Sequence, residues 1–179
     1  KNTTQKDQYF AVASFKYSVN KNLYFKLTGG GENVNFSFMD YIPYSTPSTL
    51  LGQLQKSTFE NKSYNVEFIA NYQNSFKRFN YGITLGGNVY HVDNKSHTIT
   101  AKNMSMRETV ALQSFLQKEI TEGSWRKEIN SLFGMVNLSW KDLLYADVTL
   151  RRDQSSTLPV NNNVYFYPSV GGSFFHLVN

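Results

Sequence analysis

The residues whose side chains could bind a metal or act as nucleophiles are few and scattered in this chain of 179 residues. The three histidines, His91, His97 and His176, lie far apart and lack the short spacing of a zinc site. No His-Glu-X-X-His motif and no nucleophile elbow occur, and the chain contains no cysteine. The sequence therefore indicates ordinary strand or loop histidines, and it predicts no catalytic residues, no metal site and no cofactor.

A row of polar side chains on predicted strands is the next candidate for chemistry. Asp147, Arg151 and Asp153 share one face of an alternating segment, and Glu67 and Asn71 share a face of another. Two carboxylates on one face allow acid–base catalysis in principle. The favoured interpretation is that these five residues line a watery lumen and pair across strands.

Three aromatic residues in or beside long predicted loops are candidates for substrate binding. They are Tyr41, Tyr44 and Trp125. Exposed loop rings can stack on sugars, because a sugar ring presents an apolar face to an aromatic one. Packing within the loops explains the same residues equally well, so both interpretations stay open.

The elements that position these residues are predicted to be β-strands. From Leu132 to Trp140, and again from Leu144 to Leu150, every second residue is apolar or small. The same period of two recurs at residues 9–19, 23–27, 64–72 and 79–89, and a weaker strand is expected after Val164. After Gly29–Gly31 the apolar positions shift to Val34, Phe36 and Phe38, as a one-residue bulge within the strand that begins at Leu23 would produce. One apolar and one polar face on each strand indicate a sheet half in an apolar medium.

The connections between these strands alternate between short and long. Short turns follow Val19, Phe76 and Trp140, and long loops are expected at residues 39–60, 93–125 and 154–163. Ser105 and Glu108 have capping-box spacing, so a short helix is expected within 93–125. Outer-membrane β-barrels have this asymmetry, with short periplasmic turns and long external loops.

Aromatic residues mark the strand ends beside the short turns. Tyr17, Tyr72, Phe79 and Trp140 are expected to form an aromatic belt at the membrane interface. Core packing in a soluble β-sandwich is the alternative interpretation of the same four residues.

The composition excludes several classes of protein. No apolar run approaches the roughly 20 residues of a membrane helix. The net charge of +5 is spread along the chain without a Lys/Arg cluster, so nucleic acid is not an expected partner. The absence of cysteine excludes a disulfide scaffold. Because the chain starts at Lys1 without a signal peptide, we expect it to be part of a longer protein.

One long stretch carries a family resemblance. Residues 140–153 read WKDLLYADVTLRRD, followed in order by SSTLP at 155–159, NN at 162–163 and YFYPSV at 165–170. This run resembles the late barrel strands of TonB-dependent outer-membrane transporters of the SusC/RagA type. Residues 8–88 are similar to the same family more loosely, through strand rhythm and LGGN at 85–88, whereas residues 93–128 match nothing recognisable.

The resemblance implies an all-β fold, with residues 1–179 forming about seven antiparallel strands of a transmembrane β-barrel. It implies a plug and a TonB-contacting segment outside this chain, and active uptake of an oligosaccharide or oligopeptide across the bacterial outer membrane, without enzymatic activity. The implied partners are a SusD-like surface lipoprotein, TonB and outer-membrane lipid. Seven strands cannot close so wide a barrel, so the segment should have two open edges.

The alternative hypothesis is a soluble β-sandwich that binds carbohydrate through loop tyrosines and tryptophans. In a sandwich, the apolar faces of two sheets meet each other. The barrel and the sandwich hypotheses therefore differ in which face of the alternating strands contacts water.

Overall fold

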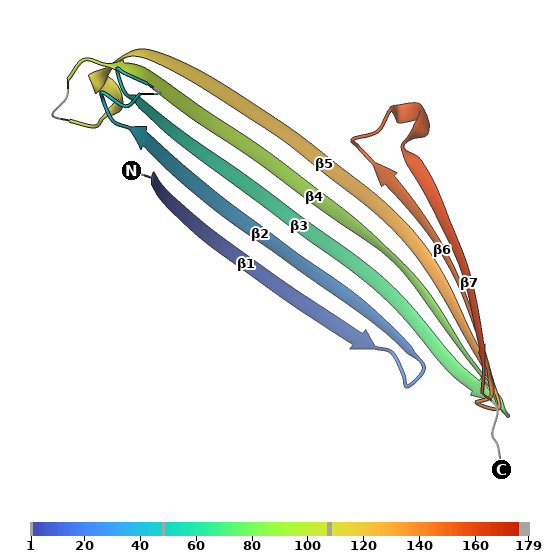
Figure 1. The fold of residues 1–179 in the computed structure, drawn as a ribbon. Coiled ribbons are helices and arrows are strands. Elements are labelled where there is room, and N and C mark those ends of the chain that lie inside the picture. The colour runs from blue at the N-terminus through green and yellow to red at the C-terminus, as the bar shows by residue number, and fades with distance from the viewer. Residues whose placement is uncertain (1, 48, 107–108, 176–179) are drawn as a thin grey trace. The chain divides into compact units, whose positions relative to one another are not determined.

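A computed structural model describes residues 2–47, 49–106 and 109–175. These residues form one sheet in which each strand lies beside the next along the chain (Figure 1). The strands are β1 (Asn2–Ser18), β2 (Leu23–Ile42), β3 (Gln53–Phe76), β4 (Phe79–Met104), β5 (Phe115–Trp140), β6 (Leu144–Ser155) and β7 (Val164–Phe174). The predicted all-β fold of about seven strands is confirmed. None of the described helices is long and apolar enough to cross a membrane.

The sheet is open in the part of the chain that the structure describes. Its strand order begins at β1 and ends at β7. Every residue of β1 is exposed, as is every residue of β7 except Val164. Two strands therefore present unpaired edges, as expected for a segment too short to close.

Two of the predicted long loops are mostly strand, which corrects the sequence-based boundaries. β2 ends at Ile42 and β3 begins at Gln53, so the loop predicted at 39–60 shrinks to 43–52. β4 ends at Met104 and β5 begins at Phe115, so the loop predicted at 93–125 shrinks to 105–114. Polar side chains on both faces remove the alternation that marks a strand, yet the backbone ladder forms without it.

The helix expected within 93–125 is smaller than predicted. The helical turn described there is η1 (Leu112–Ser114), a 3-10 helix. Leu116 and Ile120, within the segment where the helix was expected, lie in β5. Glu108 lies outside the described residues, and Ser105 donates its hydroxyl to the Ser114 carbonyl at 3.1 Å, closing the loop.

The strands divide into two compact units. Unit 1 comprises Lys1–Phe10, Glu32–Ser63 and Val92–Arg126, and unit 2 comprises Ala11–Gly31, Tyr64–His91 and Lys127–Asn179. Strands β1 to β5 contribute residues to both units, whereas β6 and β7 belong to unit 2.

In unit 2 the register of β5, β6 and β7 aligns apolar residues with one another. Val136 pairs with Val148, which in turn pairs with Val170. Three further rows across β5, β6 and β7 lie on the same side of the sheet: Gly134–Leu150–Pro168, Leu138–Ala146–Gly172 and Trp140–Leu144–Phe174. We call this side the apolar face and the other side, which carries Asp147 and Arg151, the polar face. Leu85 of β4 belongs to the apolar face, since its Cδ2 atom lies 3.3 Å from the Cβ position of Gly134.

The β5–β6 turn requires left-handed backbone at two non-glycine residues. Lys141 and Asp142 have φ values of 56° and 57°, and the Leu143 N–H donates to the Trp140 carbonyl at 3.0 Å. Left-handed backbone at two successive residues is what a type I′ turn requires, and Asn-Gly is the sequence that this turn prefers.

The double substitution Lys141→Asn with Asp142→Gly should therefore stabilise the protein by about 1 kcal/mol, because it relieves left-handed strain at two residues. Urea unfolding of the purified protein measures the effect. Asp147→Gly is the control and should lower stability, since Asp147 lies in strand β6 and accepts a hydrogen bond from Asn137. A loss of stability in the turn variant would contradict the turn geometry.

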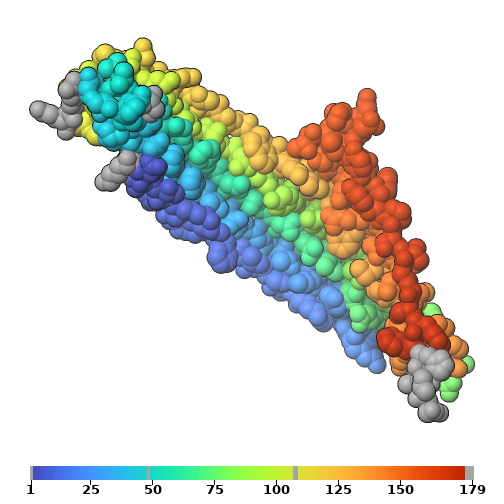
Figure 2. Space-filling view, viewed as in Figure 1, coloured from blue at the N-terminus to red at the C-terminus, as the bar shows by residue number. Residues whose placement is uncertain are grey.

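Unit 1 has its own small hydrophobic core. It consists of Leu54, Ala101, Met104 and Phe115, with Tyr41 packed against it. The backbone N–H of Met104 donates to the Leu51 carbonyl at 2.7 Å, which ties the 43–52 loop to β4. Figure 2 shows the cyan atoms of that loop gathered beside the yellow atoms of the segment before β5. The core therefore anchors the two loops of unit 1 at one place.

Candidate functional site

The polar face of unit 2 is held by side-chain hydrogen bonds between strands. The donor–acceptor pairs are Asn71 Nδ2 to Thr84 Oγ1 (2.8 Å), Asn88 Nδ2 to Asn65 Oδ1 (2.9 Å), Asn80 Nδ2 to Ser139 Oγ (3.1 Å) and Asn137 Nδ2 to Asp147 Oδ1 (2.5 Å). Amides and hydroxyls both donate and accept, so each can also bind water or a passing solute. The result is a polar surface on which most groups are uncharged.

Asn71 is the most buried residue of this network, at 7% exposed. Asn71→Leu keeps the branched shape of the side chain but leaves the Thr84 hydroxyl without its donor, and we expect a loss of about 1–2 kcal/mol in the free energy of unfolding. Denaturant unfolding measures this loss. The exposed Asn137→Leu is the matched control and should cost about 0.5 kcal/mol or less. Equal effects at the two sites would contradict the role of burial.

Three residues lie side by side on the polar face, one on each of β4, β5 and β6: Gly86, Phe133 and Arg151. A methyl group at Gly86 would lie 2.4 Å from Phe133 Cζ and 2.9 Å from the Phe68 carbonyl oxygen. The guanidinium carbon of Arg151 lies 6.0 Å from the centre of the Phe133 ring. Phe133 therefore covers a glycine on one neighbouring strand and contacts a cation on the other.

Arg151 is oriented by two further partners. Its Nε donates to both carboxylate oxygens of Asp153, at 2.8 and 3.1 Å, and its Nη2 donates to Ser131 Oγ at 3.0 Å. Ser131 is 4% exposed, whereas the Arg151 side chain is 42% exposed. The guanidinium is thus held in place while part of it stays open to solvent.

The structure places the predicted polar residues on strands of unit 2. Asp147, Arg151 and Asp153 share one face of β6, and Glu67 and Asn71 share one face of β3. Asp147 pairs across strands with Asn137, whereas Arg151 and Asp153 pair within their own strand. A lumen lining by these five residues stays a prediction.

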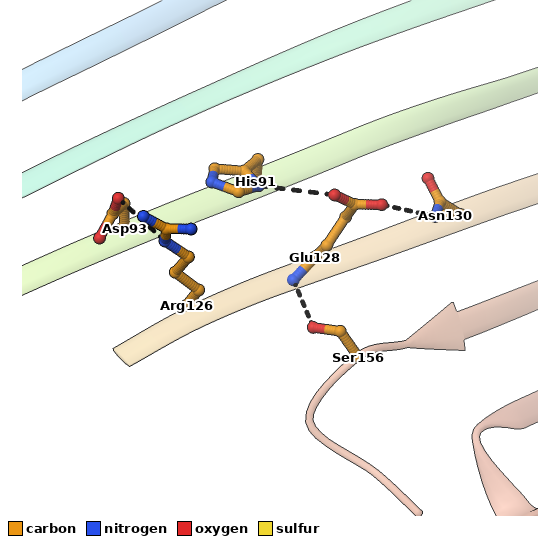
Figure 3. A network of polar contacts seen from close by, with 6 residues as sticks. All are labelled: His91, Asp93, Arg126, Glu128, Asn130 and Ser156. Atoms are coloured by element: carbon orange, nitrogen blue, oxygen red, sulfur yellow. Dashed lines mark hydrogen bonds and ion pairs between the residues drawn. The ribbon is translucent and has the colours of Figure 1, made fainter. Parts of the chain in front are cut away.

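A polar cluster in unit 2 escaped the sequence-based interpretation. His91 stacks on Tyr64 with ring centres 4.8 Å apart, and its Nδ1 lies 3.6 Å from Glu128 Oε2. Glu128 also accepts a hydrogen bond from Asn130 at 2.9 Å, and its backbone N–H donates to Ser156 Oγ at 2.8 Å (Figure 3). These residues come from different strands and a loop, so only the strand register brings them together.

Unit 1 carries polar side-chain contacts of its own. Arg126 Nε lies 3.2 Å from Asp93 Oδ2, and His97 Nδ1 lies 3.1 Å from Glu122 Oε1 (the first pair is drawn in Figure 3). No group of three or more His, Asp or Glu residues that could hold a metal ion occurs within residues 2–47, 49–106 and 109–175. His176 lies outside these ranges.

The three loop aromatics proposed for substrate binding lie in different settings. Tyr41 is at the end of β2, half-buried, with its hydroxyl 3.8 Å from Met104 Sδ. Tyr44 lies in the 43–52 loop and is half-buried, and Trp125 lies in β5 with 54% of its surface exposed. Their role toward a substrate is untested, and Trp125 is the most open of the three.

The predicted belt residues lie near strand ends. Phe79 begins β4, Trp140 ends β5, and Tyr17 lies close to the end of β1. Tyr72 and Phe79 both contact Tyr81, with ring centres 6.1 and 6.3 Å apart. Their contact with a membrane interface stays a prediction.

Comparison with solved structures defines the class of fold: the chain has the fold of a segment of much longer transporter and receptor chains. The structure of the RagAB peptide transporter matches with a TM-score of 0.85 and 20% identity, covering 97% of this chain and 20% of that chain. The RagAB peptide importer in the "open-open" state matches at 0.80, also with 20% identity and the same coverage. BauA, the ferric preacinetobactin receptor from Acinetobacter baumannii, matches at 0.62 with 10% identity, covering 96% of this chain and 28% of that chain.

At these identities the likeness establishes the fold, and it confirms the SusC/RagA-type barrel segment at that level. The chain spans about 20% of the length of the RagAB chain that it matches. No family model and no curated protein matches the sequence.

Proposed function

We propose that this chain forms part of the wall of a β-barrel that imports a nutrient across the bacterial outer membrane. The observation that carries the proposal is the exposure of the apolar face. Val148 is 46% exposed, Leu132 61% and Val170 79%, whereas Asn71 and Ser131 of the polar face are buried. In a water-soluble sheet the apolar face would be the covered one.

Strand length supports the same proposal. β6 has 12 residues and β7 has 11. A tilted strand of about 9–11 residues crosses the hydrocarbon core of a membrane. A sheet edge cannot remain unpaired in lipid, so the strands missing at β1 and β7 would come from the rest of the protein.

The parts of the longer strands that lie in unit 1 carry polar residues, which indicates that water surrounds them. Glu60 and Lys62 on β3 form a 2.6 Å ion pair on one face, while Asn61 on the opposite face donates to Asn94 at 3.2 Å. Strand residues with polar groups on both faces are unsuited to hydrocarbon. We assign these residues to an extension of the sheet on the external side.

The cargo that we propose is an oligopeptide or oligosaccharide, driven by TonB and received together with a SusD-like surface lipoprotein. The SusC/RagA resemblance and the structural likeness to a peptide transporter support this choice. The polar face, rich in amides and hydroxyls, offers hydrogen bonds to either class of solute. The plug and the TonB-contacting segment would lie elsewhere in the protein, and no chemistry on the cargo is proposed.

A soluble β-sandwich would need a second sheet over the apolar face. The described residues form a single sheet, so nothing in them covers that face. This observation favours contact with lipid.

Deleting the gene from its host tests the proposed function. Cells should lose uptake of fluorescent oligopeptides or oligosaccharides, and a plasmid copy should restore it only when TonB and the proton-motive force are present. The protein should fractionate with the outer membrane and require detergent for extraction. Unchanged uptake of both classes, with the protein in the soluble fraction, would overturn the proposal.

A further inference from the structure

A groove of about 340 Å³ lies on unit 2 beside Gly87 of β4. Its apolar walls include Val66, Phe68, Val89 and Leu132. A methyl group at Gly87 would lie 3.0 Å from Leu132 Cδ2 and 2.9 Å from the Ser131 carbonyl oxygen. Glycine at this position therefore lets β4 and β5 approach closely beside the groove, since any side chain would displace Leu132 or the strand backbone.

One cation lines the groove. Arg152 pairs in register with Leu132 of β5 and Phe166 of β7, so its strand neighbours on this face are both apolar. Its guanidinium forms no hydrogen bond or ion pair with any residue that the structure describes. On β5, the carboxylate of Glu128 accepts a hydrogen bond from Asn130 and lies 3.6 Å from His91 Nδ1.

We propose that the groove binds an anionic membrane lipid, with one acyl chain against Val66, Phe68 and Leu132 and the lipid phosphate on Arg152. This inference rests on the proposed function, since the apolar face must meet the membrane. An unpaired guanidinium has a planar fork of donors that matches a phosphate, and it is more weakly hydrated than an ammonium group. A groove lined by several apolar side chains and one unpaired cation complements a lipid, which joins an acyl chain to one anion.

The position of Arg152 along β6 indicates the side of the barrel. Arg152 lies near the end of β6 that leads into the 156–163 loop, away from the short turn at Lys141 and Asp142. Long loops of outer-membrane barrels are external. The proposed phosphate contact therefore lies toward the external side of the barrel.

Native mass spectrometry of the full-length protein, delipidated in detergent, tests this proposal. Three probes separate the parts of the ligand: phosphatidylglycerol, diacylglycerol with the same chains and no phosphate, and glycerol 3-phosphate with no chains. Arg152→Gln should lower phosphatidylglycerol affinity roughly tenfold and leave diacylglycerol unchanged, because only the charge-assisted contact is lost. The phosphatidylglycerol affinity of Arg152→Lys should lie between those of the wild type and Arg152→Gln, since lysine keeps the charge but lacks the planar pair of donors.

Two further variants complete the design. Val66→Trp should weaken both lipids by filling the groove, and Arg126→Gln, which removes a cation paired with Asp93, should weaken neither. Equal phosphatidylglycerol binding in wild type and Arg152→Gln would overturn the proposal. So would glycerol 3-phosphate binding as tightly as the lipid, which would indicate an anion site alone. A protein that stays soluble without detergent would instead refute the proposed function.

Discussion

Gly86→Ala should destabilise the protein by about 1–3 kcal/mol, the usual cost of overpacking. The added methyl group would lie 2.4 Å from Phe133 Cζ and 2.9 Å from the Phe68 carbonyl oxygen. The Phe133 ring must move, and it would then leave its place beside Arg151. Urea unfolding of the purified protein in detergent measures the loss, and the yield of folded protein should fall with it.

The chain supplies a matched control for this substitution. Gly29 of β2 has no atom within 4 Å of its Cβ position, so Gly29→Ala should be neutral or slightly stabilising. Removing the ring in Gly86→Ala/Phe133→Ala should recover part of the loss relative to the sum of the two single variants. If Gly29→Ala and Gly86→Ala were equally costly, the contact with Phe133 would not be the cause.

Val148→Arg should lower stability in a lipid bilayer by about 2–4 kcal/mol, the cost of an arginine facing the hydrocarbon midplane of a β-barrel. Val148 is the middle member of the row Val136–Val148–Val170 and is 46% exposed. Folding into lipid vesicles, followed by denaturant unfolding, measures the effect.

Thr149→Arg is the control, since Thr149 is the next residue of β6 and lies on the polar face opposite Met135. It should cost far less than Val148→Arg. A water-soluble protein would tolerate arginine at an exposed valine within about 0.5 kcal/mol. A small effect at both positions would therefore contradict contact between the apolar face and lipid.

Period-two alternation predicts the strands of unit 2 well. The alternate residues from Leu132 to Trp140 of β5 and from Leu144 to Leu150 of β6 lie on one face of the sheet, as their spacing indicated. Alternation arises wherever one face of a strand is apolar and the other polar. It therefore depends on the surroundings of the two faces as well as on the extended backbone.

The same signal fails in unit 1 for a physical reason. Residues 57–63 are strand, yet Ser57, Glu60, Asn61 and Lys62 put polar groups on both faces. With no apolar face there is no period to detect, and the sequence resembles a loop. Only the partner strands, which supply the backbone hydrogen bonds, determine that these residues are extended.

Contacts between strands are the part of the candidate site that the sequence could not predict. The spacing of Arg151 and Asp153 places them on one face, but nothing in the spacing brings Phe133 over Gly86 or Glu128 to His91. Those contacts depend on the register between strands, which shifts side chains to the other face when it slips by one residue. The glycines at 86 and 87 were a partial signal, since a glycine in a strand often marks a close approach.

The central claim is that the apolar face of unit 2 contacts lipid while the polar face contacts water. Because the chain has no cysteine, single cysteines can carry spin labels at chosen sites. Labels at residues 146–150 of β6, read in bilayers by electron paramagnetic resonance, should alternate. We expect Ala146, Val148 and Leu150 to be accessible to oxygen, and Asp147 and Thr149 to a water-soluble nickel chelate. Uniform access of the nickel chelate to all five positions would contradict the claim.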